Sequence, residues 1–337
     1  MQMYAGIDLH SSNNYVGIID ENDKRVFGKR LENCLPTLLS VLDPFKQLLV
    51  AIVVESTYNW YWLVDGLQDH GYKVHLANPS AVKQYEGLKY TDDKWDSFWL
   101  AHMKRLGILP EGYIYPKESR PIRDFLRRRM LFVQQRTSQF LSLQSMITRN
   151  LGKRMSVNML KKLKKEDIDS MFDHTLAMMA KSHLSAIISL NDIIKNIEKE
   201  VLFQVKLRKE FELLQTIPGI GKILALTIML EVGDINRFLK VGNYSSYCRC
   251  VKSEKISNGK KKGKNNQKNG NKYLSWAYVE AANFANRYCN GAKRFYQRKK
   301  AKRNNIVATK ALSNKICRAS YYIMRDQVPF DEVRLFC

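Results

Sequence analysis

The chain has 337 residues, of which 45% are hydrophobic and 11% aromatic, a composition typical of a folded protein and not of a disordered one. No apolar run reaches the about 20 residues of a membrane span, and the formal net charge of +24 suggests a polyanionic partner instead. The six cysteines follow no disulfide or zinc-binding spacing, and the chain opens without a secretory signal, so we expect a cytoplasmic, nucleoid-associated protein.

The first hundred residues predict strands that alternate with helices. Three short strands come first, and a helix separates them from an almost wholly apolar strand over residues 49–55, as in a strand buried on both faces. This order is typical of an RNase H-like α/β domain. The predicted strands cover residues 4–10, 15–20, 25–31, 49–55 and 73–77, and the predicted helices cover 35–48, 60–70 and a segment that opens at Pro79.

From residue 121 to 208 no strand is expected. Residues 131–151 and 184–205 carry apolar side chains at three- and four-residue spacing, which predicts two long helices with a basic loop, 153–165, between them. Each helix has one apolar stripe that needs a partner, so we expect an antiparallel pair or an intermolecular coiled coil. The predicted domains are therefore 1–115, a helical coiled-coil spacer at 116–210, and a mostly α-helical basic domain at 211–337.

The last of these domains opens with Pro218-Gly219-Ile220-Gly221 between two helical patterns. Such a turn is typical of a helix-hairpin-helix element, in which small residues let backbone amides approach a phosphate. Gly219 and Gly221 are therefore candidate nucleic-acid contacts. A plain tight connection between two helices explains the same residues equally well.

The positive charge is concentrated in the second half of the chain. Residues 1–110 carry 11 Lys and Arg against 13 Asp and Glu, whereas residues 236–310 carry 20 against two, Glu254 and Glu280. A surplus of this size repels itself unless a polyanion neutralises it, which predicts nucleic-acid binding rather than a merely solvated face. The candidate lysines are Lys252, Lys255, Lys260, Lys261, Lys262, Lys264, Lys268 and Lys272, and five aromatic residues nearby (Tyr273, Trp276, Tyr278, Phe284 and Tyr288) either stack on bases or belong to the core.

Four carboxylates fall at the ends of the predicted elements. Asp8 lies near the end of the first strand, and Glu55 closes the 49–55 strand, which neighbours the first in an RNase H-like sheet. Asp93 and Asp96 are three residues apart at the start of a helical stretch, so they face the same side of it. Converging carboxylates repel each other unless hard cations lie between them, and carboxylate oxygens suit Mg²⁺. The pattern predicts a two-metal site for phosphoryl transfer, although any one of these acids could simply be a cap or a solvated charge.

These residues belong to motifs that resemble the DEDD transposases of the insertion sequence 110 family. The motifs occur in family order over nearly the whole chain. In the first half they are G-I-D-L-H (6–10), V-V-E-S-T-Y (53–58), A-N-P (77–79) and D-x-x-D-S followed by L-A (93–101). In the second half they are T-I-P-G-I-G (216–221), G-D-I-N-R-F (233–238), S-N-G (257–259) and N-G-N-K-Y-L (269–274).

The resemblance implies a Holliday-junction-resolvase-like (RuvC-like) fold, with Asp8, Glu55, Asp93 and Asp96 as the DEDD tetrad and Ser257 as the nucleophile. It also implies donor and target DNA as substrates, a structured bridge RNA that selects the target, and dimers that pair into a tetramer. In such a tetramer the tetrad of one protomer can meet the serine of another. The implied reaction is cleavage and rejoining of DNA strands through a phosphoserine link.

The match leaves alternatives open. The family usually writes Ser-Gly or Ser-Ser-Gly where this chain has Ser257-Asn258-Gly259, so a shift of one residue would align Asn258, and Ser253 is a second candidate nucleophile. Asp92 precedes Asp93, but only Asp93 is three residues from Asp96. Rival functions are a site-specific DNA invertase with the same motifs, a junction-resolving nuclease that uses the carboxylates and water, and a nucleic-acid-binding protein without catalysis.

Overall fold

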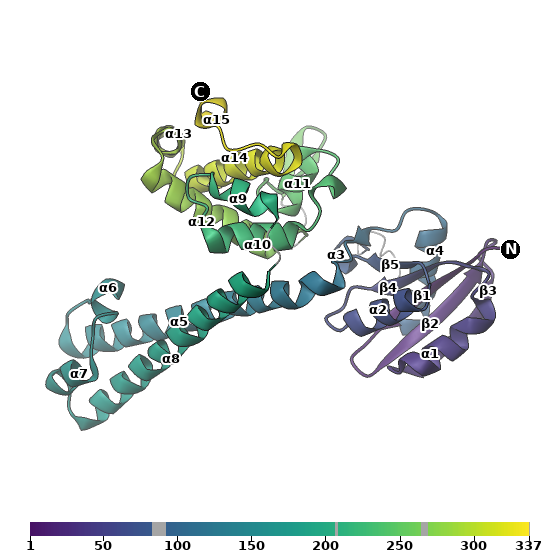
Figure 1. Ribbon diagram of the computed structural model, residues 1–337, viewed down its shortest axis with the longest axis horizontal. Coiled ribbons are helices and arrows are strands. Elements are labelled where there is room, and N and C mark those ends of the chain that lie inside the picture. The colour runs from purple at the N-terminus through teal and green to yellow at the C-terminus, as the bar shows by residue number, and fades with distance from the viewer. Residues whose placement is uncertain (83–91, 206–207, 264–268, 337) are drawn as a thin grey trace. The chain divides into compact units, whose positions relative to one another are not determined.

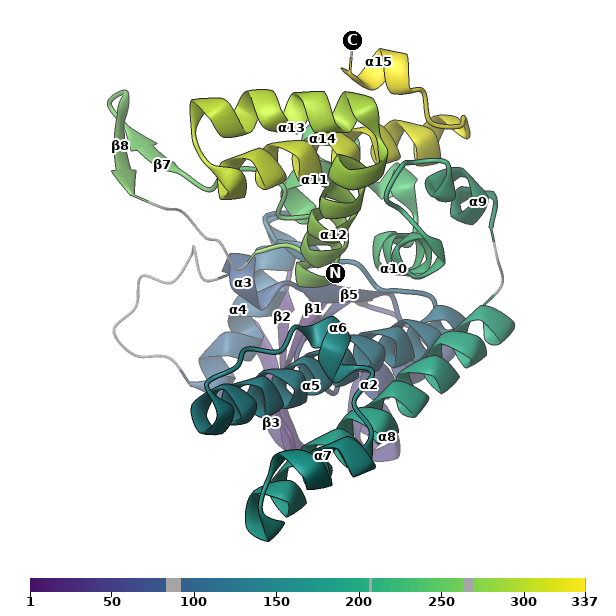
Figure 2. The same ribbon diagram turned by 90° about the vertical axis from the view of Figure 1, so that its left-hand side faces the viewer.

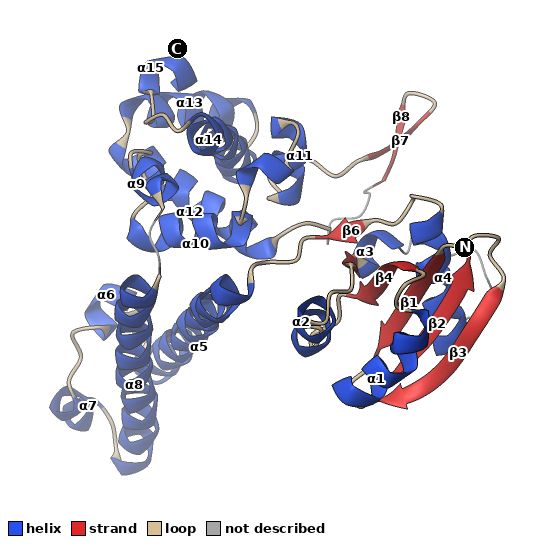
Figure 3. Cartoon of the chain, turned by 45° about the vertical axis from the view of Figure 1, so that its right-hand side comes forward, coloured by secondary structure: helices blue, strands red, loops and turns tan. Residues whose placement is uncertain are grey.

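The structure is a computed structural model that describes residues 1–82, 92–205, 208–263 and 269–336. The chain divides into two compact units, Met1–Lys117 and Glu118–Cys337. The first unit is built on a sheet and the second on helices, as Figure 3 shows by colour.

The sheet of the first unit has the strand order β3-β2-β1-β4-β5-β6. β1, β2 and β3 are antiparallel neighbours, whereas β1, β4 and β5 run parallel. This is the predicted RNase H-like arrangement, and the α/β assignment is confirmed. Two-residue β6 was not predicted because it is too short to show a period. The bounds are β1 (Met3–Leu9), β2 (Asn13–Asp20), β3 (Arg25–Glu32), β4 (Leu49–Glu55), β5 (Val74–Ala77) and β6 (Glu111–Gly112).

Helices cover both faces of this sheet (Figure 1). Side chains alternate along a strand, so Ile7 of β1 and Val54 of β4 join a core with α1 (Leu35–Leu42) and α2 (Tyr61–Asp69). Val53 of β4 faces the other way and packs with Leu100 and Met103 of α4 (Asp93–Arg105). The sheet is thus buried on both sides over its central strands.

The helix predicted over residues 35–48 is wrong in its second half. α1 ends at Leu42, and a short 3₁₀ helix, η1 (Asp43–Phe45), follows. Pro44 explains the end, because its ring lacks the amide hydrogen and crowds the preceding turn of an α-helix. A further short helix, α3 (Pro79–Val82), begins at the expected proline.

In the second unit two long helices, α5 (Arg120–Leu151) and α8 (His174–Gln204), lie side by side (Figure 1). Both begin about ten residues before the predicted helices, α5 in a stretch whose apolar spacing is weak. The segment predicted as a basic loop contains α6 (Val157–Leu160), and α7 (Lys165–Met171) begins at its last residue. Leu160 and Ile168 are fully buried against α5 and α8, and this burial explains why the segment is ordered into helices.

The rest of the second unit is a helical bundle around α10 (Lys222–Val232), which is buried from Leu224 to Val232. Its core includes residues of α12 and α14. The other elements are α9 (Lys209–Gln215), η4 (Ile235–Arg237), α11 (Val241–Tyr247), β7 (Lys255–Ser257), β8 (Lys260–Gly263), α12 (Lys272–Tyr288), α13 (Asn290–Lys302), α14 (Asn305–Asp326) and α15 (Glu332–Phe336). Among the described residues, no helix combines the length and apolar character needed to cross a membrane.

Candidate functional site

Strand alternation brings Asp8 and Glu55 to one face of the sheet. On β1, Asp8 is two residues from Gly6, and on β4, Glu55 is two residues from Val53. Since Gly6 and Val53 lie on the sheet face covered by α4, Asp8 and Glu55 lie on that face too. Ile7 pairs with Val54 in the parallel ladder, which makes the two acids neighbours at the same strand ends. The prediction from strand order therefore agrees with the geometry for these two residues.

Gly6 lets α4 pack directly on β1. A methyl group at Gly6 would lie 1.9 Å from the Ser97 carbonyl oxygen and 2.9 Å from the Ala101 amide nitrogen, both of them backbone atoms of α4. Any larger residue at this position would push the helix away from the sheet. The close approach brings the N-terminus of α4, which carries Asp93 and Asp96, to the strand ends.

The two adjacent aspartates at the start of α4 have different contacts. Asp92 is the N-cap residue, and its Oδ1 accepts a hydrogen bond of 2.7 Å from the Trp95 amide. Asp93 instead forms an ion pair of 2.6 Å with Arg30 of β3, and its Oδ1 lies 3.2 Å from Nε2 of His10. This difference favours Asp93 over Asp92 as the member of the tetrad.

Asp8 lies at the centre of the group. It is only 3% exposed, and burial raises the pKa of its carboxyl above the usual range. The charges of Asp96 and Asp93 raise this pKa further, while His10 and a hydrogen bond with Glu55 oppose the increase. The other three predicted carboxylates are therefore each close enough to act on Asp8.

A divalent cation fits this group. A buried carboxylate among three others is electrostatically costly, and a cation between the oxygens removes the repulsion. Arg30 pairs with Asp93 only, whereas Nε2 of His10 lies 3.1 Å from Oδ2 of Asp8 and 3.2 Å from Oδ1 of Asp93. Asp8, His10 and Asp93 can offer ligand atoms that all lie within 4.8 Å of one another. From the sequence, the position of His10 two residues after Asp8 places it near the expected metal and indicates a group that supports the ligands rather than a ligand itself.

Ser257 is the last residue of β7 in an exposed hairpin. Ser257 pairs with Lys260, and Asn258 and Gly259 form the two-residue turn, both with left-handed backbone (φ 49° and 69°). Asn-Gly is the preferred sequence for such a turn. Figure 2 shows the hairpin projecting from the helices of its unit. Ser253 lies two residues before the hairpin and is half-buried.

The described candidate lysines are all exposed. Lys260 and Lys262 lie on β8, and Lys261 forms an ion pair of 2.8 Å with Glu254. Lys264 and Lys268 lie outside the described residues. The remaining candidates are Lys252, Lys255 and Lys272, the last at the start of α12.

The aromatic residues near these lysines divide into two groups. Tyr278 is fully buried and belongs to the core. Phe284 and Tyr288 are exposed on α12, with their rings nearly parallel and 6.5 Å apart. The interpretation as core residues is thus right for Tyr278 and wrong for Phe284 and Tyr288, which remain available to stack on bases.

The two glycines of the predicted helix-hairpin-helix turn, Gly219 and Gly221, have different surroundings. Gly219 has left-handed backbone (φ 93°), and a methyl group there would lie 2.4 Å from the carbonyl oxygen of Ala281 on α12. This packing alone accounts for Gly219. Gly221 is the N-cap residue of α10 and has open space at its Cβ position. Phosphate binding by either glycine stays a prediction.

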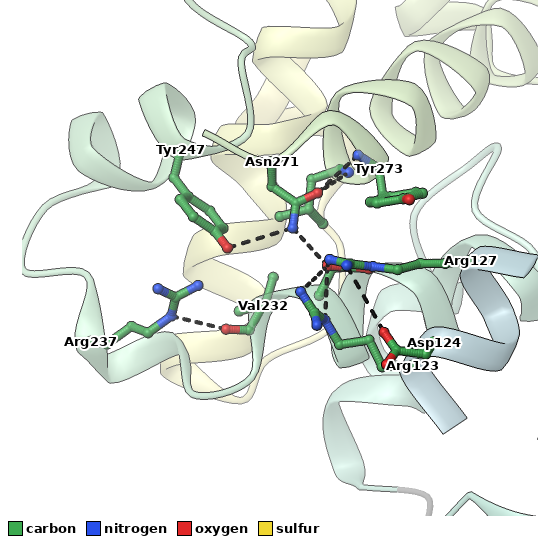
Figure 4. Close-up of polar contacts among 10 residues, drawn as sticks. Arg123, Asp124, Arg127, Val232, Arg237, Tyr247, Asn271 and Tyr273 are labelled. Atoms are coloured by element: carbon green, nitrogen blue, oxygen red, sulfur yellow. Dashed lines mark hydrogen bonds and ion pairs between the residues drawn. The ribbon is translucent and has the colours of Figure 1, made fainter. Parts of the chain in front are cut away.

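A buried polar cluster lies where α5, α10 and the start of α12 meet (Figure 4). Glu231 of α10 is 2% exposed and accepts hydrogen bonds from Arg123 (3.0 Å), Arg127 (2.7 Å) and Asn271 (2.7 Å). Burial alone would raise the pKa of Glu231, but the two guanidinium groups outweigh it and hold this pKa below its usual range. Sequence reasoning missed the cluster, although Glu231 is the one acid in a helix that is apolar apart from Lys222 and Thr227.

The same cluster also holds the residues that flank the β7–β8 hairpin, which we call the hairpin arm. The Oδ1 atom of Asn271 caps α12 by accepting hydrogen bonds from the Tyr273 and Leu274 backbone amides. The backbone amide of Asn271 donates to the Tyr247 carbonyl at 2.6 Å. Arg249 donates to the Gly270 carbonyl at 3.0 Å. Both ends of the segment that carries Ser257 are therefore anchored in the helical bundle.

Two family models match the chain, one in each half. The DEDD transposase model of IS110 matches residues 5–150, and the model described as the transposase IS116/IS110/IS902 family matches residues 211–297. RuvC of T. thermophilus, solved in complex with a Holliday junction substrate, matches 33% of this chain and 100% of its own at 17% identity and a TM-score of 0.26. No curated protein matches. Since the two family models together span well over half of the 337 residues, the chain belongs to the IS110 family of DEDD transposases.

Proposed function

We propose that this protein cuts and rejoins DNA strands for the insertion and excision of a mobile element, through a serine–DNA ester and with Mg²⁺ at the tetrad. Family membership makes it a DNA-acting enzyme of the transposase, recombinase or nuclease type. The observation that carries the proposal is the buried carboxylate of Asp8 with Glu55, Asp93 and Asp96 as its neighbours.

The chemistry is a pair of transesterifications. Mg²⁺ held by the tetrad would stabilise the charge that develops on the phosphate oxygens. The Oγ atom of Ser257 forms a bond to phosphorus, the bond from phosphorus to one deoxyribose oxygen breaks, and the serine proton ends on that oxygen. Rejoining is the reverse step with the hydroxyl of another strand. Lys260, which pairs with Ser257 across the hairpin, would stabilise the phosphate charge during both steps together with Lys262 on the same strand.

The partners follow from the family resemblance. They are donor and target DNA, a bridge RNA that selects the target, and further copies of the chain arranged as a dimer of dimers. We expect the assembly to work on the nucleoid in the cytoplasm. An invertase of the same family would use the same residues, and only the DNA that flanks the gene distinguishes the two.

Asp8→Asn tests the metal centre of this proposal. The substitution removes one charged ligand, so it should abolish Mg²⁺-dependent cleavage of cognate DNA while folding and nucleic-acid binding persist. Asp92→Asn is the matched control, because asparagine caps a helix as well as aspartate does and Asp92 serves as the cap of α4. Full cleavage by Asp8→Asn would contradict the proposal, as would an equal loss in both variants.

A further inference from the structure

We infer that His10 is a nitrogen ligand of the divalent cation at the tetrad, and that it shifts the preference of this centre from Mg²⁺ toward Mn²⁺. The inference rests on the metal centre of the proposed function. It concerns a residue outside the four carboxylates and a property, metal preference, that the carboxylates alone do not determine.

The spacing of the three atoms suits coordination of one ion. Nε2 of His10 lies 3.1 Å from Oδ2 of Asp8 and 3.2 Å from Oδ1 of Asp93. Adjacent ligand atoms of an octahedral ion with bonds of about 2.1 Å are about 3 Å apart. The ring nitrogen therefore already lies at the separation of a neighbouring ligand from each of the two carboxylate oxygens. Among the described residues, no other group of His, Cys, Asp or Glu side chains has such a geometry.

The backbone of His10 is held from two sides. Its carbonyl oxygen accepts hydrogen bonds from the side-chain amides of Asn33 (3.0 Å) and Asn59 (2.9 Å), and its own amide donates to the Asn13 carbonyl at 2.9 Å. Asn33 follows β3, and Asn59 lies between β4 and α2. Three separate segments thus fix a residue just beyond the end of β1, although its side chain is 45% exposed. Such support is what a metal ligand needs to keep its orientation.

His10 differs from Arg30, the other basic group at the site. Arg30 pairs with the Oδ2 atom of Asp93, the oxygen that does not face His10, and a guanidinium cannot bind a metal. An imidazole nitrogen can bind one. First-row transition metal ions accept such a ligand, Mn²⁺ the least strongly of them, whereas Mg²⁺ keeps to oxygen ligands. Loss of the imidazole should therefore weaken Mn²⁺ binding more than Mg²⁺ binding.

Pulsed electron paramagnetic resonance of Mn²⁺ bound to the full chain, without nucleic acid, tests this directly. We expect electron spin-echo modulation from a coordinated ¹⁴N nucleus, which changes on ¹⁵N-histidine labelling. His10→Gln should lose this signal and bind Mn²⁺ roughly tenfold more weakly, with a smaller change for Mg²⁺. His102→Gln is the matched control, because His102 also contacts a carboxylate, that of Asp23 at 2.8 Å, away from the tetrad.

The outcomes distinguish the role of His10 as a ligand from the existence of the metal centre itself. Bound Mn²⁺ that depends on Asp8 but shows no nitrogen signal would overturn the role of His10 and leave the metal centre in place. A nitrogen signal that survives in His10→Gln would also overturn it. If Mn²⁺ binds equally well to Asp8→Asn, or does not bind at all, the metal centre of the proposed function fails, and the His10 inference fails with it.

Discussion

Asn271 contacts the buried Glu231 carboxylate and also caps the N-terminus of α12. Its Nδ2 atom donates to the buried Glu231 carboxylate at 2.7 Å, while its Oδ1 atom caps α12. The acid at the centre of the helical bundle thus holds the residue from which the hairpin arm returns to α12. We therefore expect that a substitution of Glu231 also loosens the attachment of the hairpin segment that carries Ser257.

Glu231→Gln should lower the free energy of unfolding by about 3 kcal/mol, because it removes the negative charge beside buried Arg123 and half-buried Arg127. Urea denaturation followed by circular dichroism measures this change. Glu198→Gln is the matched control: Glu198 also pairs with an arginine, Arg129 at 2.6 Å, but is partly exposed, so its loss should be about 1 kcal/mol or less. Equal losses in the two variants would contradict the account of the cluster.

Glu231 should also make stability depend on pH. Because its pKa is lowered in the folded state, its contribution is complete above the unfolded value near 4.5 and is lost as the pH falls through the folded value. Between pH 7 and pH 3 the wild-type chain should therefore lose more stability than Glu231→Gln loses. Parallel denaturation curves at both pH values measure the difference, and an identical loss would mean that folding does not lower the pKa of Glu231.

Gly6→Ala should disturb the tetrad by displacing α4, which carries Asp93 and Asp96. The added methyl group meets backbone atoms of α4, which cannot rotate away, so we expect a cost near the upper end of the about 1–3 kcal/mol typical of overpacking. Displacement of α4 should also weaken divalent-metal binding. Gly112→Ala on β6 is the control, since a methyl group there makes only ordinary contacts of 3.5 Å. A Gly6→Ala protein with normal stability and metal affinity would show that α4 does not need this close approach.

Neutralising Lys260, Lys261 and Lys262 to glutamine should weaken binding to DNA and RNA of any sequence. It should also reduce the slope of log affinity against log salt by about two units, with Lys261 contributing least because it already pairs with Glu254. The control replaces three exposed lysines of the near-neutral first unit, Lys24, Lys29 and Lys73. An unchanged slope in the hairpin variant would mean that these lysines contact no phosphate.

Much of the first unit could be predicted because its signals are local. Apolar runs mark β1 and β4, and acids at their ends mark the site. The register that brings Asp8 beside Glu55 follows from the strand order of an RNase H-like sheet. Close approach of α4 at Gly6 could not be foreseen, since it depends on the backbone of a segment about ninety residues away.

The second unit was less predictable for a different physical reason. The first turns of α5 are rich in arginine and show little apolar spacing, yet they are ordered because Arg123 and Arg127 reach Glu231, more than one hundred residues along the chain. The β7–β8 hairpin had a local signal in Asn258-Gly259, which was overlooked because its short strands are lysine-rich rather than apolar.

The central claim is that Ser257 attacks DNA, and mass spectrometry of the covalent product tests it most directly. Full-length protein incubated with cognate DNA, Mg²⁺ and bridge RNA should yield a peptide that carries a phosphodiester link on Ser257. Ser257→Ala should give no adduct and no recombination, yet bind nucleic acid almost normally, because one exposed hydroxyl contributes about 1 kcal/mol or less. Ser253→Ala should keep the adduct. A link on any other side chain, or recombination that survives in Ser257→Ala, would contradict the account, and cleavage without any adduct would identify the protein as a metal-dependent nuclease.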